Sequence, residues 1–290
     1  MSLIEAIILG IAQGLTEFLP ISSSGHLIII PWLFGWETPG LAFDAALHLG
    51  TLLAVFTYFW RELVDIFRAI PTMLRKNVSL LKGPEPGESD DTFYARLGIL
   101  IVIGSIPGGV IGLLFQDRLD DFFHSDTNEE RAIIVIAVLL AAFAILLWLA
   151  DKYGKEIRIL RSIRVPDAVA IGVAQAIALM PGTSRSGVTL TAGLFRDFTR
   201  ADAARFSFLL GIPLVTFAGL KGLADLIQSD PSGTEITRIV AGMTASAVSG
   251  FLAIRFLLRY LQTKSTAVFV IYRIIASIVL IGLVLSGFRS

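Results

Sequence analysis

Three kinds of reactive side chain gather near the amino terminus. Glu17 and His26 flank the consecutive serines Ser22, Ser23 and Ser24 within ten residues. A carboxylate, a hydroxyl and an imidazole are the minimum set for nucleophilic attack on phosphorus with control of the proton. The alternative is that the serines only cap a helix and that His26 packs against a neighbour. A carboxylate within an apolar segment is costly and marks a functional site by default, so Glu17 favours the chemical interpretation.

A second polar segment extends from Pro181 to Thr189. Serine oxygens, such as those of Ser184 and Ser186, accept hydrogen bonds from the first N–H groups of a helix while their hydroxyls can still donate. Arg185 adds a planar, permanently charged group that suits phosphate oxygens. The amino termini of helices also attract anions. The segment therefore predicts binding of a phosphate or diphosphate rather than a neutral ligand.

The elements that must position these residues are membrane helices. The 290-residue chain is 54% hydrophobic and only 17% charged, with a mean hydropathy of +0.76, which is far from an ordinary soluble domain. A spanning helix needs about 20 mostly apolar residues. The formal net charge of zero, with scattered basic residues, argues against nucleic-acid binding, and the lack of cysteine excludes disulfides and thiol catalysis. Six stretches are long and apolar enough to span: 43–60, 94–115, 132–150, 206–223, 236–257 and 267–285.

The two reactive segments lie in apolar stretches that are too broken to span. Residues 3–35 and 168–195 each have the pattern of helix, polar break and helix, with a proline at the break. Backbone groups freed by such a break are tolerated at membrane depth only where protein or a water-filled cavity surrounds them. We therefore expect two re-entrant hairpins around a central cavity.

The hairpins also form the clearest part of an internal repeat. Gln13 corresponds to Gln175, and Ser22 to Ser184, at one constant offset. The order of one hairpin and three spans occurs twice, and an odd number of spans inverts the second unit. The sequence thus predicts an all-α integral membrane protein with six transmembrane helices and two re-entrant hairpins in an inverted-topology repeat. Its parts are a first repeat at 1–150, a cytoplasmic linker at 151–165 and a second repeat at 166–290.

Loop charges predict the orientation, because cytoplasmic loops are rich in Lys and Arg. Three loops have this character, within residues 61–82, 152–164 and 255–264. The alternate loops, at 116–130 and 225–235, hold one basic residue between them. Both termini and the opening of the first hairpin are therefore expected on the outer face.

The two polar segments resemble the signatures of a known family. Residues Gln13 to His26, QGLTEFLPISSSGH, resemble the first signature of the bacterial undecaprenyl-diphosphate phosphatases, also called bacitracin resistance proteins, and Pro181 to Thr189 resembles the second. The resemblance covers the whole chain in length and hydropathy. It implies hydrolysis of undecaprenyl diphosphate to undecaprenyl phosphate and inorganic phosphate on the outer face of the bacterial plasma membrane. This reaction recycles the lipid carrier for cell-wall synthesis.

The resemblance also implies roles for individual residues. Ser23 is expected to be the nucleophile, Glu17 and His26 its acid–base or metal-binding helpers, and Arg185 the phosphate clamp. A divalent cation, Mg²⁺ or Ca²⁺, is implied as cofactor. Many family members have a second glutamate where this chain has Gln13, whose amide oxygen can still ligate a hard cation or contact the substrate. Further donors to the substrate are expected from Ser22, Ser24, Ser184, Ser186 and Thr189.

Other intramembrane polar residues carry weaker predictions. Arg273, inside the last span, is expected to face the phosphate. Asp44 and His48, four residues apart, are expected to form an interfacial hydrogen-bonded pair, with metal binding or proton transfer as the alternative.

The sequence leaves alternatives open for mechanism and for function. Water could attack phosphorus directly, with Ser23 only positioning it. Inverted repeats with broken helices are also transporter architecture, so a transporter or flippase of a polyprenyl phosphate or another anion is the second candidate function. The nucleophile with its flanking acid and base favours a hydrolase. Small residues on the helix faces favour a homodimer.

Overall fold

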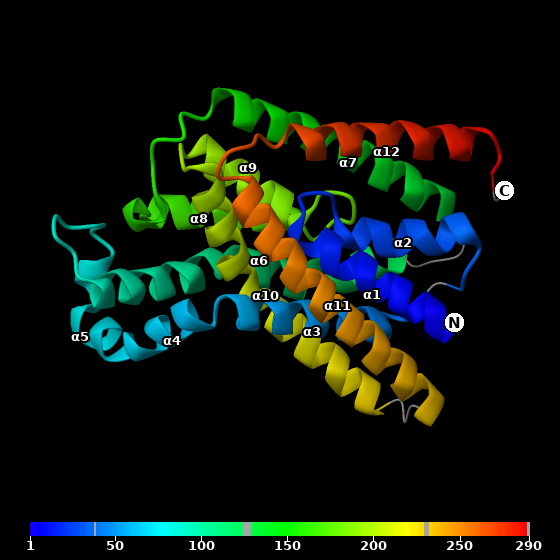
Figure 1. Cartoon of the computed structure of the whole chain (residues 1–290), viewed down its shortest axis with the longest axis horizontal. Helices are drawn as coiled ribbons and strands as arrows, with labels where there is room; N and C mark the ends of the chain where they lie inside the picture. Colours follow the sequence, from blue (N-terminus) through cyan, green and yellow to red (C-terminus); the bar gives the residue numbers. More distant parts are fainter. Residues whose placement is uncertain (38, 124–128, 229–231, 289–290) are drawn as a thin grey trace.

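The computed structural model describes residues 1–37, 39–123, 129–228 and 232–288 (Figure 1). These residues are predominantly α-helical, and within them the only bridge of β type joins Arg158 to Phe198. The elements are α1 (Leu3–Phe18), α2 (Ser23–Phe34), α3 (Leu41–Tyr58), α4 (Trp60–Arg68), α5 (Ile70–Leu80), α6 (Asp90–Phe123), α7 (Glu129–Tyr153), the 3₁₀ turn η2 (Leu160–Ser162), α8 (Val165–Ile177), α9 (Arg185–Phe195), α10 (Arg200–Gln228), α11 (Gly233–Tyr260) and α12 (Ala267–Leu285).

Five of these helices, α6, α7, α10, α11 and α12, are long and apolar enough to cross a membrane. A sixth crossing is formed if α3 and α4 count as one span, although the two helices meet at an angle of 74°. The all-α membrane class that the sequence predicts is therefore confirmed. The placement of the first span on residues 43–60 agrees with α3, which ends at Tyr58.

The segment after this span differs from the sequence prediction. Residues 61–82 were expected to be a loop because of their charges, but they form most of α4 and α5. Leu63 and Ile66 of α4 pack against the hydrophobic core, and Arg68 is the basic residue in the last turn of this helix. Apolar residues at helical spacing among charged ones make an amphipathic helix, and this pattern outweighs the charge count.

The two predicted hairpins are present as pairs of short helices. The first break separates α1 from α2 and the second separates α8 from α9. The second helix of each pair begins within the polar segment, α2 at Ser23 and α9 at Arg185. Ser22 and Ser184 cap these two helices, as expected for serines. Re-entry into a bilayer and the inverted repeat stay predictions.

Close helix packing places each hairpin against a long helix of the other half of the chain. α1 packs on α11, and a Cβ added at Gly10 would lie 2.2 Å from the carbonyl oxygen of Gly242. α8 packs on α6, and a Cβ added at Gly172 would lie 2.2 Å from the carbonyl oxygen of Gly104. Such approaches are possible only between small residues. The two contacts fix how deeply each polar break lies in the molecule.

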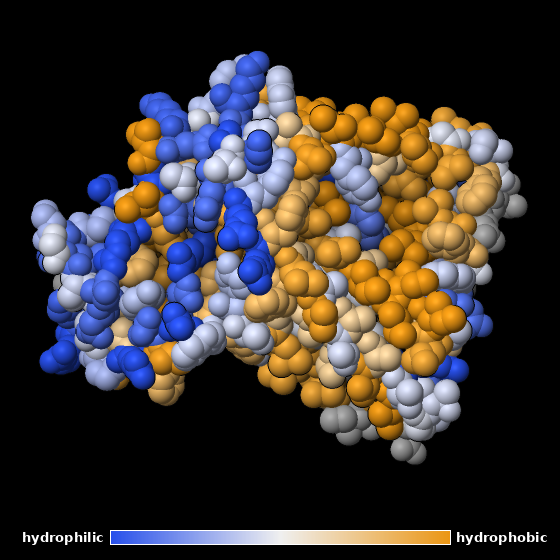
Figure 2. Space-filling model, in the orientation of Figure 1, coloured by the Kyte–Doolittle hydropathy of each residue, from blue (hydrophilic) through white to orange (hydrophobic). Residues whose placement is uncertain are grey.

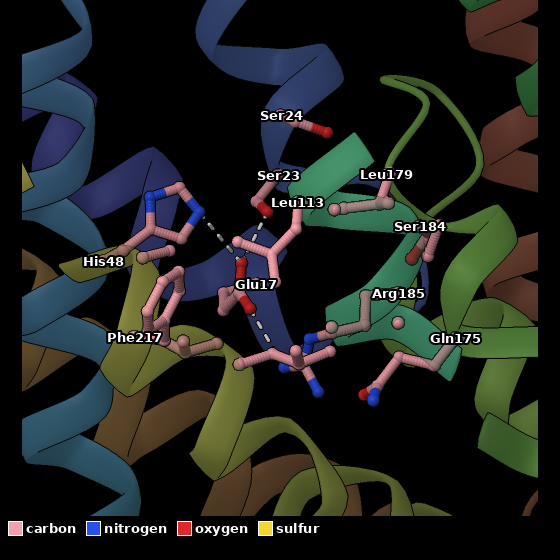
Figure 3. Close-up of a pocket in the computed structure, with 17 residues that line it drawn as sticks. Glu17, Ser23, Ser24, His48, Leu113, Gln175, Leu179, Ser184, Arg185 and Phe217 are labelled. Carbon is pink, nitrogen blue, oxygen red and sulfur yellow. Dashed lines mark hydrogen bonds and ion pairs between the residues drawn. The ribbon is translucent and has the colours of Figure 1, made fainter. Parts of the chain in front are cut away.

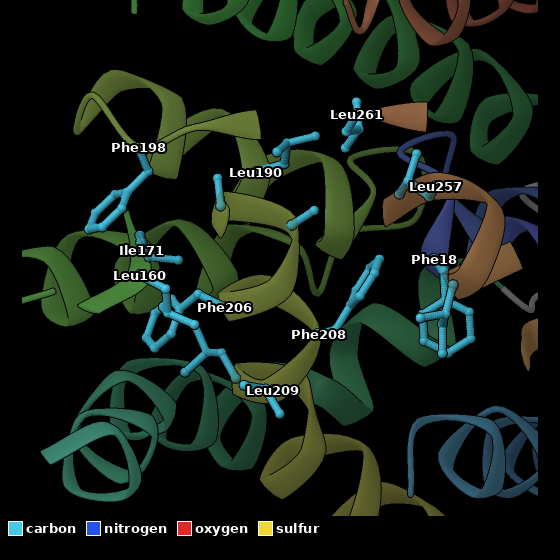
Figure 4. Close-up of a cluster of buried hydrophobic side chains, with 14 of the residues drawn as sticks. Phe18, Leu160, Ile171, Leu190, Phe198, Phe206, Phe208, Leu209, Leu257 and Leu261 are labelled. Carbon is cyan, nitrogen blue, oxygen red and sulfur yellow. The ribbon is translucent and has the colours of Figure 1, made fainter. Parts of the chain in front are cut away.

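The largest hydrophobic cluster lies beside the breaks and joins α1, α8, α9, α10 and α11 (Figure 4). Phe18 and Phe208 are almost fully buried and meet edge to face, with ring centroids 5.3 Å apart. Edge-to-face packing of aromatic rings is specific in geometry. Since Phe18 directly follows Glu17, this cluster holds the carboxylate-bearing end of α1 in place.

The surface divides into a hydrophilic end and a hydrophobic remainder. Figure 2 shows hydrophilic residues gathered over α4, α5 and the region around α8, and hydrophobic residues over much of the remaining visible face. At the hydrophilic end Arg158 donates to both carboxylate oxygens of Asp167, at 2.9 and 2.6 Å. These hydrogen bonds raise the pKa of Arg158. The linker is thus tied to the start of α8 by a paired charge.

Candidate active site

The two polar breaks border one cavity of about 230 Å³ (Figure 3). One part of its lining is polar and comes from α1, α2, α3, α8 and α9. The other part is apolar or glycine and comes mainly from α6 and α10. The polar lining consists of Glu17, Ser23, Ser24, His48, Gln175, Ser184 and Arg185, and the rest of Gly108, Gly109, Gly112, Leu113, Ala178, Leu179, Leu214, Val215, Phe217 and Ala218.

Glu17 is the centre of the polar part. Its side chain is only 6% exposed, and its Oε2 accepts a hydrogen bond from Ser23 Oγ at 2.6 Å. Its Oε1 accepts from Arg185 Nη2 at 2.9 Å. A buried carboxylate needs such partners, because an unpaired charge is very costly away from water. The carboxylate is therefore placed to take the proton of Ser23 while Arg185 balances its charge.

Arg185 is held by the neighbouring helix α10. Its Nη1 donates to the carbonyl oxygen of Ser207 at 3.1 Å, and a Cβ added at Gly211 would lie 2.0 Å from the same nitrogen. Thr189 Oγ1 donates to the carbonyl oxygen of Arg185 at 2.7 Å and accepts from the Ser207 hydroxyl. Thr189, predicted to bind the substrate, thus braces the arginine and does not line the cavity.

Matching local geometry presents Ser23 and Arg185 to the cavity. The residues before them, Ser22 and Ser184, have φ of 77° and 70°. Residues other than glycine rarely adopt such backbone angles, and those that do are often found at functional sites. Each serine oxygen accepts from the N–H three residues on, in Gly25 and Gly187. The reactive residues therefore occupy the first turn of each half-helix.

The two breaks are also tied to each other. Gly182 N donates to Ser22 Oγ at 3.0 Å, and Ser186 Oγ donates to the carbonyl oxygen of Leu19 at 3.1 Å. Neither Ser22 nor Ser186 lines the cavity. These two serines, predicted as donors to the substrate, instead join the loops, whereas Ser24 and Ser184 do face the cavity.

The structure places His26 away from the reacting groups. Its Nδ1 lies 2.6 Å from the carbonyl oxygen of Ser22, and its Nε2 lies 2.6 Å from the hydroxyl of Tyr272. Both ring nitrogens are thus engaged, and the residue is absent from the cavity lining. Of the two predicted acid–base helpers, Glu17 contacts Ser23 directly, whereas His26 is engaged by Ser22 and Tyr272.

Arg273 likewise has partners other than those predicted. Its guanidinium is fully buried and donates to four backbone carbonyls, those of Leu140, Pro20, Gly182 and Thr183, at 3.0–3.3 Å. Three of these carbonyls belong to the two breaks. Arg273 does not line the cavity and instead joins both loops, so it is not placed to contact a phosphate there.

The donor set for a divalent cation is small but has the right chemistry. Gln13 Nε2 donates to Glu17 Oε2 at 3.2 Å, and Gln13 Oε1 is buried without a hydrogen-bond partner in the described part of the chain. In that part no group of three or more His, Cys, Asp or Glu residues comes together. Mg²⁺ is bound by one or two protein oxygens with phosphate and water completing its shell. Glu17 and Gln13 Oε1 fit such a cation.

Two polar residues of the cavity were not expected there first: His48 was expected mainly to pair with Asp44, and Gln175 carried no site prediction of its own. His48 Nε2 lies 3.8 Å from Glu17 Oε2, and its Nδ1 lies 2.8 Å from the backbone oxygen of Asp44. Asp44 and His48 thus form the expected hydrogen-bonded pair, but through the backbone oxygen of Asp44, and the His48 side chain lines the cavity. Gln175 also lines the cavity. Its correspondence to Gln13 in the repeat was the signal that could have identified it.

Comparisons with known proteins agree on one family. The family model for the bacitracin resistance protein BacA matches residues 6–279. The undecaprenyl-diphosphatase of Thermomicrobium roseum is 47% identical over 97% of this chain and 98% of its own length. Those of Gloeobacter violaceus and Chlorobium phaeovibrioides are each 45% identical over 99% of this chain, and over 93% and 99% of their own lengths.

Proposed function

Because the chain belongs to the bacitracin resistance protein family, we propose that it is an undecaprenyl-diphosphatase that releases inorganic phosphate and leaves undecaprenyl phosphate. The observation that carries the assignment to this site is the hydrogen bond from Ser23 Oγ to the buried carboxylate of Glu17, beside Arg185. A nucleophile, a base and a positively charged side chain that can bind phosphate, in one cavity, are the parts of a phosphoryl-transfer site. They favour a hydrolase over a transporter.

The reaction begins with the terminal phosphate bound beside Arg185. Ser23 Oγ attacks the terminal phosphorus, and its proton passes to Glu17. The bond from this phosphorus to the bridging oxygen breaks, and undecaprenyl phosphate leaves with the bond electrons. Arg185 stabilises the charge of the transferring group, since fixed positive charge in a water-poor site acts strongly on it. Glu17 passes the proton of Ser23 to the departing undecaprenyl phosphate. Water then attacks the phosphoserine and gives a proton to Glu17, and Glu17 returns this proton to Ser23 Oγ as inorganic phosphate departs.

Glu17 and Gln13 would hold the divalent cation that the family implies. When bound, such a cation neutralises part of the charge of the diphosphate. Gln13 contributes no charge, so Glu17 is the only carboxylate available to the cation among the described residues that line the cavity.

The apolar part of the cavity suits a lipid chain. Gly109 and Gly112 of α6 leave space there, since a Cβ added to either would meet its nearest neighbour at 3.8–3.9 Å. Leu113 and Phe217 of the same lining are 75% and 58% exposed on the hydrophobic surface. The prenyl chain can therefore leave the cavity sideways between α6 and α10, toward lipid.

The proposed location is the bacterial plasma membrane with the first hairpin open to the outer face. Figure 1 shows both termini at one end of the molecule and α4 and α5, which carry part of the basic residues, at the other. This arrangement supports the orientation given by the loop charges. The proposed homodimer stays a prediction.

The function is tested by phosphate release from a long-chain prenyl diphosphate, using purified protein in detergent with and without a chelator. We expect cation-dependent release. Ser23→Ala and Glu17→Gln should lower kcat by about 10²–10⁴-fold, because they remove the nucleophile or its base. Ser24→Ala, which keeps Ser23 and Glu17 intact, is the matched control, and its kcat should fall much less. No release by the wild type under any cation would overturn the proposal.

A further inference from the structure

Gln175 is a buried amide with nothing in the described structure to bind. Its side chain is 2% exposed and lines the cavity, yet neither Nε2 nor Oε1 has a hydrogen-bond partner among the described residues. Buried amides are nearly always hydrogen-bonded, because an unpaired one loses its contacts with water without compensation. An unpaired amide at a cavity wall therefore indicates that a ligand completes it.

A second unpaired donor lies in the same cavity. Arg185 uses Nη1 for Ser207 and Nη2 for Glu17, but its Nε–H is buried and has no partner in the ranges that the structure describes. In the view of Figure 3 the guanidinium of Arg185 lies between Glu17 and Gln175. The cavity thus has a reacting side, with Glu17 and Ser23, and a side beyond Arg185, where unpaired donors remain.

A diphosphate has two phosphates that need different surroundings. Its terminal phosphate must reach Ser23, so its lipid-linked phosphate lies farther along the cavity. Gln175 stands near the start of the apolar lining, since its Nε2 would be 3.7 Å from a Cβ added at Gly108. The lipid-linked phosphate must occupy such a boundary, because the prenyl chain follows it directly.

We propose that the Gln175 amide N–H, together with Arg185 Nε–H, binds the lipid-linked phosphate of a prenyl diphosphate. This inference rests on the proposed function and names the second phosphate subsite of the same cavity. Neutral amide and guanidinium donors bind phosphate oxygens without a proton transfer. Gln175 is thus a binding residue for the part of the substrate that does not react.

The corresponding residue of the first hairpin has a different contact. Gln13 donates to Glu17 and does not line the cavity. The two glutamines of the repeat therefore have different roles: Gln13 contacts the base and would hold the cation beside it, and Gln175 binds the substrate. Gln13→Leu is consequently a matched control for substitutions of Gln175.

The lipid product keeps the phosphate that Gln175 binds, and this gives the test its selectivity. Prenyl monophosphate should compete for the Gln175 subsite, whereas inorganic phosphate should compete for the subsite beside Ser23. The inhibition constants of the two products are therefore measured for wild type, Gln175→Leu, Gln175→Glu and Gln13→Leu, together with kcat and KM for the diphosphate.

Gln175→Leu should raise KM and the inhibition constant of prenyl monophosphate together, by about tenfold or more, as expected for a lost hydrogen bond to a charged group. Inhibition by inorganic phosphate should not change, which also shows an intact fold. Gln13→Leu should mainly lower kcat. Gln175→Glu should bind prenyl monophosphate more weakly still, because its carboxylate repels phosphate. Glutamate is close to glutamine in size, so this variant provides the test if the leucine variant does not fold.

Unchanged KM and unchanged monophosphate inhibition in both Gln175 variants would overturn the inference. A wild-type inhibition constant of prenyl monophosphate in Gln175→Glu would also overturn the inference. A carboxylate cannot donate a hydrogen bond to phosphate, so the side chain at this position would then act as a cation ligand and not as a phosphate donor. Both results presuppose an active wild type, whereas an inactive wild type would refute the proposed function itself.

Discussion

At the scale of the residue, the position of Arg185 depends on a glycine of a neighbouring helix. Because a Cβ at Gly211 would lie 2.0 Å from Arg185 Nη1, Gly211→Ala should displace the guanidinium from Glu17 and Ser207 while the helix itself remains. A misplacement of about 1 Å at a phosphoryl-transfer site lowers the rate by about 10²-fold. We expect that loss in kcat/KM, together with a lower thermal stability, because the buried Glu17 carboxylate loses its charged partner.

Gly282→Ala is the control for this substitution. Gly282 lies in α12 outside the cavity lining, and a Cβ added there would meet no atom within 4 Å. Wild-type kinetics in Gly211→Ala, or an equal loss in Gly282→Ala, would show that the arginine does not need this glycine.

Contacts between residues close in sequence were predictable, whereas most contacts between distant residues were not. Glu17 and Ser23 are six residues apart and meet across one helix break. His26 meets Tyr272 from 246 residues away, and Arg273 meets carbonyls in both breaks. A sequence shows that a buried arginine or histidine needs partners, but it does not show that backbone carbonyls will supply them.

At the scale of the element, hydrophobic length located the long helices because a run of about 20 apolar residues has few other solutions in a membrane protein. It failed for α4 and α5, which are amphipathic and follow a 74° bend after α3. The first residues of α2 and α9, Ser23 and Arg185, could not be predicted, because serine and arginine can belong equally to a loop or to a first helical turn.

At the scale of the whole molecule, the proposed orientation places the two ends of α12 on opposite sides of the membrane. The wild-type chain has no cysteine, so single-cysteine variants report accessibility without background. Gln262 precedes α12 and Ser286 follows it, and both are exposed. In intact cells, a membrane-impermeant thiol reagent should label Ser286→Cys, and it should label Gln262→Cys only after permeabilisation. The reverse pattern would invert the orientation.

In the proposed reaction Ser23, activated by Glu17, becomes phosphorylated. The most direct measurement is a rapid quench of the wild-type protein with prenyl diphosphate that carries a radiolabelled terminal phosphate. We expect label on the protein at early times, located on Ser23, and none in Ser23→Ala. Phosphate release by an active wild type with no labelled protein at any quench time would contradict it and would assign the attack to water.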